Sequence, residues 1–187
     1  MTDPARLLDV IETDILPLTE AGVARGDKVF GAAILRKSDL GLVIAGTNAE
    51  TDNPLWHGEV HTLKQFYELP DPPPTRDLIF LSTHEPCTMC MSAITWAGFD
   101  NYVYLFSHED SRDGFAIPHD LKIMKELYGL DAGGYRRQNA FFTATALRDL
   151  IGPDPRLGKR ADAIAARYAA LSNAYQAGKD GNAIPLN

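Results

Sequence analysis

The chain has 187 residues, 45% of them hydrophobic and 23% charged, with a formal net charge of −7 at pH 7. This composition suits a globular chain with one sizeable core. The acidic balance disfavours a nucleic acid as partner, because nucleic-acid-binding proteins carry basic patches. We expect no membrane partner and no signal peptide, since no apolar run has the length or the flanks of either. The two cysteines, Cys87 and Cys90, lie too close together to staple a fold, which favours metal or redox chemistry in the cytoplasm.

The N-terminal part of the sequence predicts a helix followed by a β-hairpin. Asp and Pro at positions 3 and 4 are typical of a helix start, and apolar residues at helical spacing continue until Gly22 and Gly26 end the pattern. Residues 29–35 and 42–45 are apolar runs separated by a polar turn, as expected for the two strands of a hairpin. Asn48 would then lie just beyond the second strand.

The central part of the sequence alternates helices with strands. Asn53-Pro54 predicts the start of one helix, and Pro86 predicts the first turn of another. The wholly apolar run 78–81 and the run 102–106 are typical of buried strands. Strands that alternate with helices in this way predict a sheet with parallel pairs and helices that cover it.

The last third of the sequence has a less regular pattern. Residues 107–113 are rich in acidic side chains and predict a loop, whereas residues 119–127 predict a helix. Apolar residues between 161 and 175 recur at helical spacing and predict a final helix. We therefore expect one domain over residues 1–187, with a core at about 28–128, an N-terminal helix and a helical C-terminal extension.

Two short motifs carry residue types with a specific chemistry. The first is His-Gly-Glu at 57–59, and the second is Pro-Cys-Thr-Met-Cys at 86–90. Zinc prefers thiolate and imidazole ligands, so His57, Cys87 and Cys90 are the candidate ligands of one zinc ion. Three protein ligands leave a fourth position for water, which is typical of catalytic rather than structural zinc sites.

Glu59 is the candidate proton carrier of this site. It follows His57 by two residues, so it can flank the metal without binding it and can act as general base and acid. Cys87 and Cys90 would lie at a helix start, where unpaired N–H groups favour thiolates. The order His-x-Glu followed by Pro-Cys-x-x-Cys is the signature of zinc deaminases of nucleobases.

Other interpretations of these motifs are weaker. A redox pair usually lacks an upstream His-x-Glu, and a structural zinc site needs a second pair of Cys or His ligands. His61 follows His57 at helical spacing, but a metalloprotease helix carries its carboxylate directly after the first histidine, where this chain has Gly58. We interpret His61 as a residue that packs near the site.

Residues 30–128 resemble the cytidine deaminase-like superfamily, and the segment 83–97 is similar to that of bacterial guanine deaminases and tRNA adenosine deaminases. The resemblance implies an α/β fold, namely a three-layer α/β/α sandwich with a central mixed five-stranded sheet, and a homodimer. It also implies that Asn48 hydrogen-bonds the edge of a substrate ring. Gly58 stands where relatives usually carry Ala, which we interpret as extra room beside the metal.

We therefore expect a zinc-dependent hydrolase of nucleobase metabolism, which acts on a C–N bond of a cyclic amidine and releases ammonia. Its favoured substrate is a free purine base such as guanine. The alternatives are cytosine, cytidine or deoxycytidylate, the adenosine of a tRNA, and a non-catalytic zinc-stabilised interaction protein. We expect one Zn²⁺ per chain and Glu59 as the catalytic residue. The residues expected to contact the substrate are Asn48, Trp56, Gly58, His84, Glu85, Pro86, Asp110 and Phe141.

Overall fold

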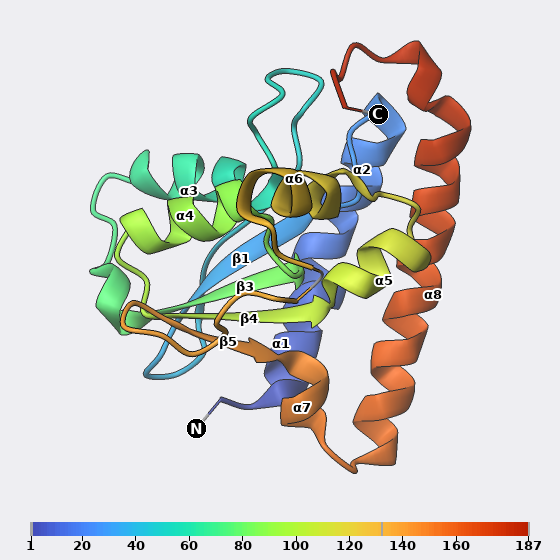
Figure 1. The fold of residues 1–187 in the computed structure, drawn as a ribbon. Coiled ribbons are helices and arrows are strands. Elements are labelled where there is room, and N and C mark those ends of the chain that lie inside the picture. The colour runs from blue at the N-terminus through green and yellow to red at the C-terminus, as the bar shows by residue number, and fades with distance from the viewer. Residues whose placement is uncertain (1, 132, 187) are drawn as a thin grey trace.

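The computed structural model describes residues 2–131 and 133–186, and Figure 1 shows how they are arranged. The strands of this part of the chain are β1 (Gly31–Arg36), β2 (Leu42–Thr47), β3 (Leu78–His84), β4 (Asn101–Phe106) and β5 (Thr143–Ala146). They form one five-stranded sheet in the order β2-β1-β3-β4-β5. Strand β1 pairs antiparallel with β2 and β3, whereas β4 pairs parallel with β3 and β5. The predicted mixed sheet is confirmed.

Helices cover both faces of this sheet (Figure 1). One face carries α3 (Gly58–Tyr67), α4 (Thr88–Trp96) and α6 (His119–Tyr128). The other face carries α1 (Pro4–Val10), the π-helical segment η1 (Ile11–Ile15), α2 (Leu16–Arg25), α7 (Leu147–Ile151) and α8 (Pro155–Gly178). The short helices are α5 (His108–Asp113), η2 (Thr75–Asp77) and η3 (Lys179–Gly181). These layers confirm the predicted α/β/α sandwich.

Strand β3 shows why two separate cores form. Ile79 and Leu81 belong to the core under α1, α2 and α8, whereas Leu78 and Phe80 belong to the core under α3 and α4. Every residue of β3 is buried. A strand covered on both faces therefore has the continuous apolar run seen in the sequence. Burial of one such large side chain stabilises the fold by about 1.5–3 kcal/mol.

The predicted hairpin of β1 and β2 is confirmed, and its register determines where Asn48 lies. Gly31 pairs with Thr47 at the open end of the hairpin. Directly beyond this pair, the backbone N–H of Asn48 donates a hydrogen bond of 2.8 Å to the carbonyl oxygen of Phe30. The chain that leaves β2 is therefore held against the start of β1.

The predicted N-terminal helix is present but contains the π-helical segment η1. Pro17 follows this segment and has no N–H to donate to the carbonyl of Thr13, so the α-helical hydrogen-bond pattern is interrupted there. The helix ends at Gly26, which has a φ of 103°. Gly22 was wrongly predicted as an end, because it lies inside α2, next to Thr47 at the end of β2.

The two helices that hold the motifs begin later than predicted. The side chain of Asn53 accepts a hydrogen bond of 3.0 Å from the N–H of Leu55, and this local turn competes with helix. Helix α3 therefore starts only after His57, which is its N-cap. Helix α4 has Cys87 as its N-cap, so Pro86 precedes the helix instead of opening it.

Two C-terminal elements also differ from the prediction. Residues 108–113 form the helix α5 rather than a loop, because the N-cap Ser107 and Asp110 form a reciprocal capping box at its start. Strand β5 and helix α8 lie outside residues 28–128, yet β5 completes the sheet and Tyr168 of α8 is fully buried in the core. Among the described residues, no helix combines the length and apolarity needed to cross a membrane.

Candidate active site

The two motifs meet where the N-terminal ends of α3 and α4 lie beside the C-terminal end of β3 (Figure 1). His57 caps α3 and Cys87 caps α4. Cys90 lies one turn further along α4 and is fully buried. The unpaired N–H groups and the positive ends of the two helices favour thiolate over thiol at this place.

The three ligand atoms have the spacing of a tetrahedral zinc site. The Sγ atoms of Cys87 and Cys90 lie 3.5 Å apart, and each lies 3.6 Å from Nδ1 of His57. Zinc–ligand bonds of ordinary length at tetrahedral angles would place two sulfurs about 3.8 Å apart and a sulfur and nitrogen about 3.6 Å apart. The structure brings the three predicted ligands together, and their geometry fits zinc.

The charges around this cluster favour a cation. Burial lowers the pKa of His57, but a hydrogen bond and the charge of Cys87, together with Glu50, outweigh burial and raise that pKa to about 10. The hydrogen bond between Cys87 and Cys90 lowers the pKa of Cys87 to about 5, whereas burial and the interaction with Cys87 raise the pKa of Cys90. One sulfur therefore carries negative charge, and a divalent cation would stabilise the second thiolate as well.

Glu59 lies in the first turn of α3 and is buried beside the ligands. The hydroxyl of Ser82 donates a hydrogen bond of 2.9 Å to its Oε1 atom. Burial raises the pKa of Glu59, although the nearby His57 and the bond from Ser82 oppose this shift. A carboxyl group with a raised pKa can take up and release a proton closer to neutral pH, as general acid–base catalysis requires.

A pocket of about 300 Å³ lies against His57. It is lined by Lys28, Glu50, Pro54, Leu55, His57, His119, Asp120, Ile123, Ile184, Pro185 and Leu186. Apart from His57, none of these residues was among the predicted contacts. They come from segments that are far apart in the sequence, including the C-terminal end, and no local pattern connects them.

Asp120 is the residue of this pocket that the sequence interpretation missed most clearly. It lies in the first turn of α6, where an acidic residue is common because it stabilises the helix N-terminus. Burial and the charge of Cys87 raise its pKa from 3.8 to about 7, although His57 and Lys28 oppose the shift. Asp120 differs from an ordinary acidic residue at a helix start only in its position near His57 and Cys87.

Two predicted substrate residues, Asn48 and Trp56, do not line the pocket but are neighbours of residues that do. Asn48 is fully buried, and its Nδ2 atom donates a hydrogen bond of 2.5 Å to Glu50 while its Oδ1 atom accepts one from the N–H of Glu50. Trp56 stacks on His61, with ring centroids 5.4 Å apart and planes at 9°. Asn48 therefore contacts a residue of the pocket wall, and His61 packs near the site as interpreted.

Gly58 has a different role from the one inferred. A Cβ atom at this position would lie 2.5 Å from the carbonyl oxygen of Phe30 and 2.9 Å from the N–H nitrogen of Gly31. The interpretation of Gly58 as extra room beside the metal was wrong, because the backbone of β1 fills that room. The missing side chain instead lets α3 start directly against the sheet.

Residues 84–86, from the last residue of β3 to the residue before Cys87, support the site from outside the pocket lining. His84 is buried among aromatic rings, and burial lowers its pKa to about 3, so it is neutral. Glu85 accepts a hydrogen bond of 3.0 Å from Arg137. The carbonyl of Pro86 lies 3.0 Å from Nε2 of His108. These contacts hold the chain that leads to Cys87.

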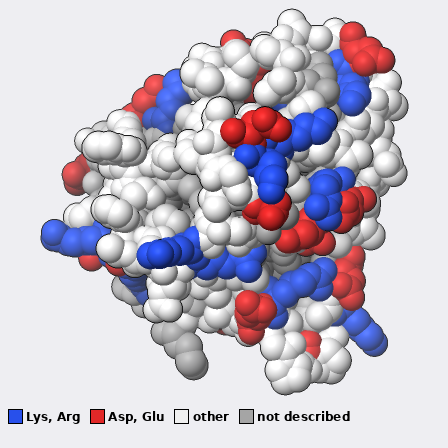
Figure 2. Space-filling model, in the orientation of Figure 1, with Lys and Arg blue, Asp and Glu red and all other residues white. Residues whose placement is uncertain are grey.

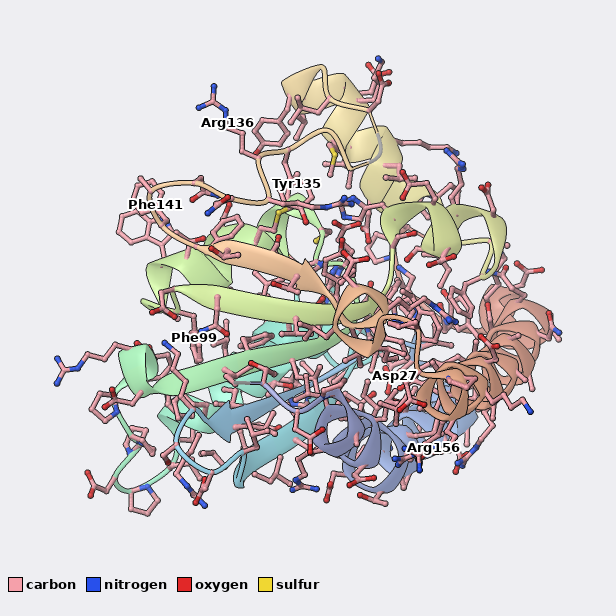
Figure 3. The ribbon with its side chains drawn as sticks, turned by 90° about the horizontal axis from the view of Figure 1, so that it is seen from below. Asp27, Phe99, Tyr135, Arg136, Phe141 and Arg156 are labelled. Atoms are coloured by element: carbon pink, nitrogen blue, oxygen red, sulfur yellow. The ribbon has the colours of Figure 1, made fainter. Side chains whose placement is uncertain are left out.

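The other two predicted contacts lie away from the metal ligands. The carboxylate of Asp110 accepts hydrogen bonds from the backbone and hydroxyl of Ser107 and thereby caps α5. Phe141 is 72% exposed and lies on a loop with Tyr135 and Arg136, at the border of the molecule in Figure 3. Spacing along the sequence does not show which way a loop turns, so neither position was predictable.

Three zinc ligands and a buried carboxyl group on a mixed sheet define the site of a zinc-dependent deaminase. The family profile described as "Cytidine and deoxycytidylate deaminase zinc-binding region" matches residues 15–106. Residues 15–106 therefore carry the zinc-binding region of this deaminase family, and together with the cluster of His57, Cys87 and Cys90 they identify a zinc-dependent hydrolase of the deaminase class. The predicted family, enzyme class and cofactor are confirmed.

Solved structures of similar fold include deaminases. Guanine deaminase from Nitrosomonas europaea is 23% identical, with a TM-score of 0.55, over 90% of this chain and 85% of that one. NE0047 in complex with 2,6-diaminopurine is 24% identical, with a TM-score of 0.55, over 91% and 83%. Guanine deaminase from Bacillus subtilis is 26% identical, with a TM-score of 0.47, over 62% and 74%. No curated protein matches the sequence significantly.

Proposed function

We propose that this protein hydrolyses the exocyclic amine of a free purine base, with guanine as the favoured substrate, and releases ammonia. The observation that carries the proposal is that Asp120 and the metal ligand His57 line the same pocket. A carboxylate accepts hydrogen bonds from amino and ring N–H groups. Guanine presents both kinds of group next to the carbon that bears its amine, so Asp120 can orient this edge toward the metal.

The size and charge of the pocket support a free base over a nucleotide. Its volume of about 300 Å³ is at the lower end of the range for small-molecule sites. The carboxylates of Glu50 and Asp120 would repel a phosphate. The net charge of −7 disfavours a tRNA, and on the face drawn in Figure 2 acidic side chains lie beside the basic ones.

The residues of the site have distinct roles in this reaction. Bound zinc would supply Lewis acidity that lowers the pKa of the attacking water. Glu59 accepts the two protons of that water one after the other; it passes the first to a ring nitrogen and the second to the departing amine, which leaves as ammonia. Ser82 holds the Glu59 carboxyl group in place. Asp120 contacts a polar edge of the ring and thereby selects its orientation, while Asn48 holds the pocket residue Glu50 in place.

The named relatives agree with this substrate class. Two structures of similar fold are those of guanine deaminases, and NE0047 is described in complex with 2,6-diaminopurine. A purine with an amine beside ring nitrogens is therefore the first ligand to test. Cytosine, cytidine, deoxycytidylate and a tRNA adenosine remain the alternative substrates.

The decisive experiment measures ammonia release by the zinc-loaded protein. The panel contains guanine, 2,6-diaminopurine, adenine, cytosine, guanosine, deoxycytidylate and a tRNA transcript. We expect kcat/KM for guanine to exceed that for every other compound, and Asp120→Asn to lower it more than it lowers zinc content. A preference for cytosine or deoxycytidylate would contradict the purine assignment, while loss of activity on every compound would contradict the whole proposal.

We also propose that the protein acts as a cytoplasmic homodimer. A reducing compartment keeps Cys87 and Cys90 available for metal. On α4, Trp96 is 92% exposed and borders an apolar groove of about 600 Å³ together with Phe141. An interface between two copies related by a two-fold axis needs projecting and receiving parts on the same patch. This face of α4 has both.

A further inference from the structure

The imidazole of His57 has two nitrogens that face different neighbours. Its Nδ1 atom faces the sulfurs of Cys87 and Cys90 at 3.6 Å. Its Nε2 atom lies 3.6 Å from Oε1 of Glu50, at the distance of an ion pair. With Nδ1 committed to a metal, Nε2 carries the proton of the ring, and the carboxylate of Glu50 is the one that lies within 4.0 Å of it among residues 2–131 and 133–186.

The carboxylate of Glu50 is itself held in place from several sides. Its Oε2 atom accepts a hydrogen bond of 2.5 Å from Asn48. Its Oε1 atom, the one that faces His57, accepts a bond of 2.9 Å from Nζ of Lys28. The side chains of Lys28 and Glu50 are 5% and 3% exposed. Because these bonds and its burial leave the Glu50 carboxylate few other conformations, it is suited to fix the orientation of the His57 ring.

Lys28 connects this arrangement to the C-terminal end of the described chain. Its Nζ atom also donates a hydrogen bond of 2.7 Å to the carbonyl oxygen of Leu186. Leu186 lines the substrate pocket together with Lys28 and Glu50. Buried cations are costly unless their donors are paired, so the position of Lys28 is determined by these two acceptors.

We propose that Glu50 is a positioning residue for the metal site. Its carboxylate accepts the Nε2 proton of His57 and thereby orients Nδ1 toward the metal, while Lys28 holds Glu50 and the C-terminal segment together. Carboxylate partners of metal-binding histidines fix the tautomer and raise the basicity of the ligand. This role concerns zinc binding, so it does not depend on which heterocycle the enzyme deaminates.

The test measures zinc affinity by competition with a chromophoric chelator, so it does not depend on activity. We expect Glu50→Gln to weaken zinc binding by about 10- to 100-fold. Because this variant leaves Lys28 buried without its counter-ion, the double variant Lys28→Met/Glu50→Gln is the decisive one, since it removes both charges together. It should bind zinc as weakly as the single variant. The matched control is Lys37→Met, which removes an exposed ion pair with Asp100 and should bind zinc within about twofold of the unaltered protein.

The proposal is overturned if the double variant binds zinc within twofold of the unaltered protein, since Glu50 would then only neutralise Lys28. A second readout is the ¹⁵N and ¹H NMR signals of the His57 ring in the zinc-loaded protein. We expect a downfield Nε2 proton that moves upfield in Glu50→Gln. An unchanged Nε2 proton signal in that variant would also contradict the proposal. Guanine turnover enters neither measurement, so failure of the purine assignment would be seen separately.

Discussion

Ser82 on β3 donates a hydrogen bond of 2.9 Å to Glu59 on α3, so the central strand holds the proposed proton carrier of the site. This bond is one of the influences that lower the pKa of Glu59 against the effect of burial. The strand that leads into the Cys87 segment therefore also orients the carboxyl group beside the metal. The hydroxyl group of Ser82 thus fixes the position of the Glu59 carboxyl group relative to the sheet.

Replacement of Ser82 by alanine should slow the reaction without removing zinc. A hydrogen bond to a charged group is worth about 1.5–3 kcal/mol, so kcat should fall by about 10-fold or more. The pKa of Glu59 should rise further, which moves the acidic limb of the pH–rate profile to higher pH. Ser92→Ala is the control, because Ser92 is exposed on α4 and bonds only the carbonyl of Thr88 among the described residues. An unchanged profile in Ser82→Ala would contradict the assignment.

Glu59 and Cys87 should respond differently to substitution. Glu59→Gln should retain zinc and lose about 10²- to 10⁴-fold in kcat, because general acid–base catalysis contributes that much. Cys87→Ala should lose both zinc and activity, because only two ligands remain. Zinc content by atomic absorption and ammonia release are measured on the same samples. Near-normal ammonia release by Glu59→Gln would exclude it as the proton carrier.

Gly58→Ala should destabilise the fold. A Cβ atom there would lie 2.5 Å from the carbonyl oxygen of Phe30, so α3 and β1 must separate. We expect the free energy of unfolding to fall by about 1–3 kcal/mol, as for other overpacked positions. Gly158→Ala in α8 is the control, since a Cβ atom has open space there and alanine favours helix. Equal stability of the two variants in chemical denaturation would contradict the prediction, because β1 and α3 would then separate at little cost in free energy.

Asp120 should make the stability of the zinc-free protein depend on pH. Its pKa is raised from 3.8 to about 7, first of all by burial. Between these values the folded protein binds more protons than the unfolded chain, so the free energy of unfolding falls as pH rises from about 4 to about 7. Asp120→Asn should remove this part of the slope. Urea unfolding of chelator-treated protein across that range measures it, and parallel curves for both proteins would contradict the prediction.

Trp96→Glu should convert a dimer into a monomer. The charged side chain would replace an indole that is 92% exposed in the single chain. It would oppose burial of the apolar groove bordered by Trp96 and Phe141. Sedimentation equilibrium measures the change in mass. Leu18→Glu on α2 is the control, because Leu18 is also partly exposed but lies on the other face of the sheet. A monomeric unaltered protein at micromolar concentration would contradict the dimer.

Most of the fold was predictable because its main elements have local patterns. The hairpin, the apolar strand at 78–81 and the helix at 119–127 agree with the structure within a few residues. Strand β5 was missed because four residues of the sequence Thr-Ala-Thr-Ala have no distinctive period, and only pairing with β4 makes them a strand. The helix at 108–113 was missed because its capping box outweighs the acidic composition.

The sequence by itself determined which side chains can bind zinc and carry protons. Ligand chemistry depends on residue type and short spacing, and both are visible in His57, Glu59, Cys87 and Cys90. Only the tertiary structure decided what surrounds them. Asp120, Lys28 and the C-terminal segment reach the pocket because the sheet order and the packing of α6 bring distant segments together. Such contacts depend on long-range packing, which a local pattern of residues does not record.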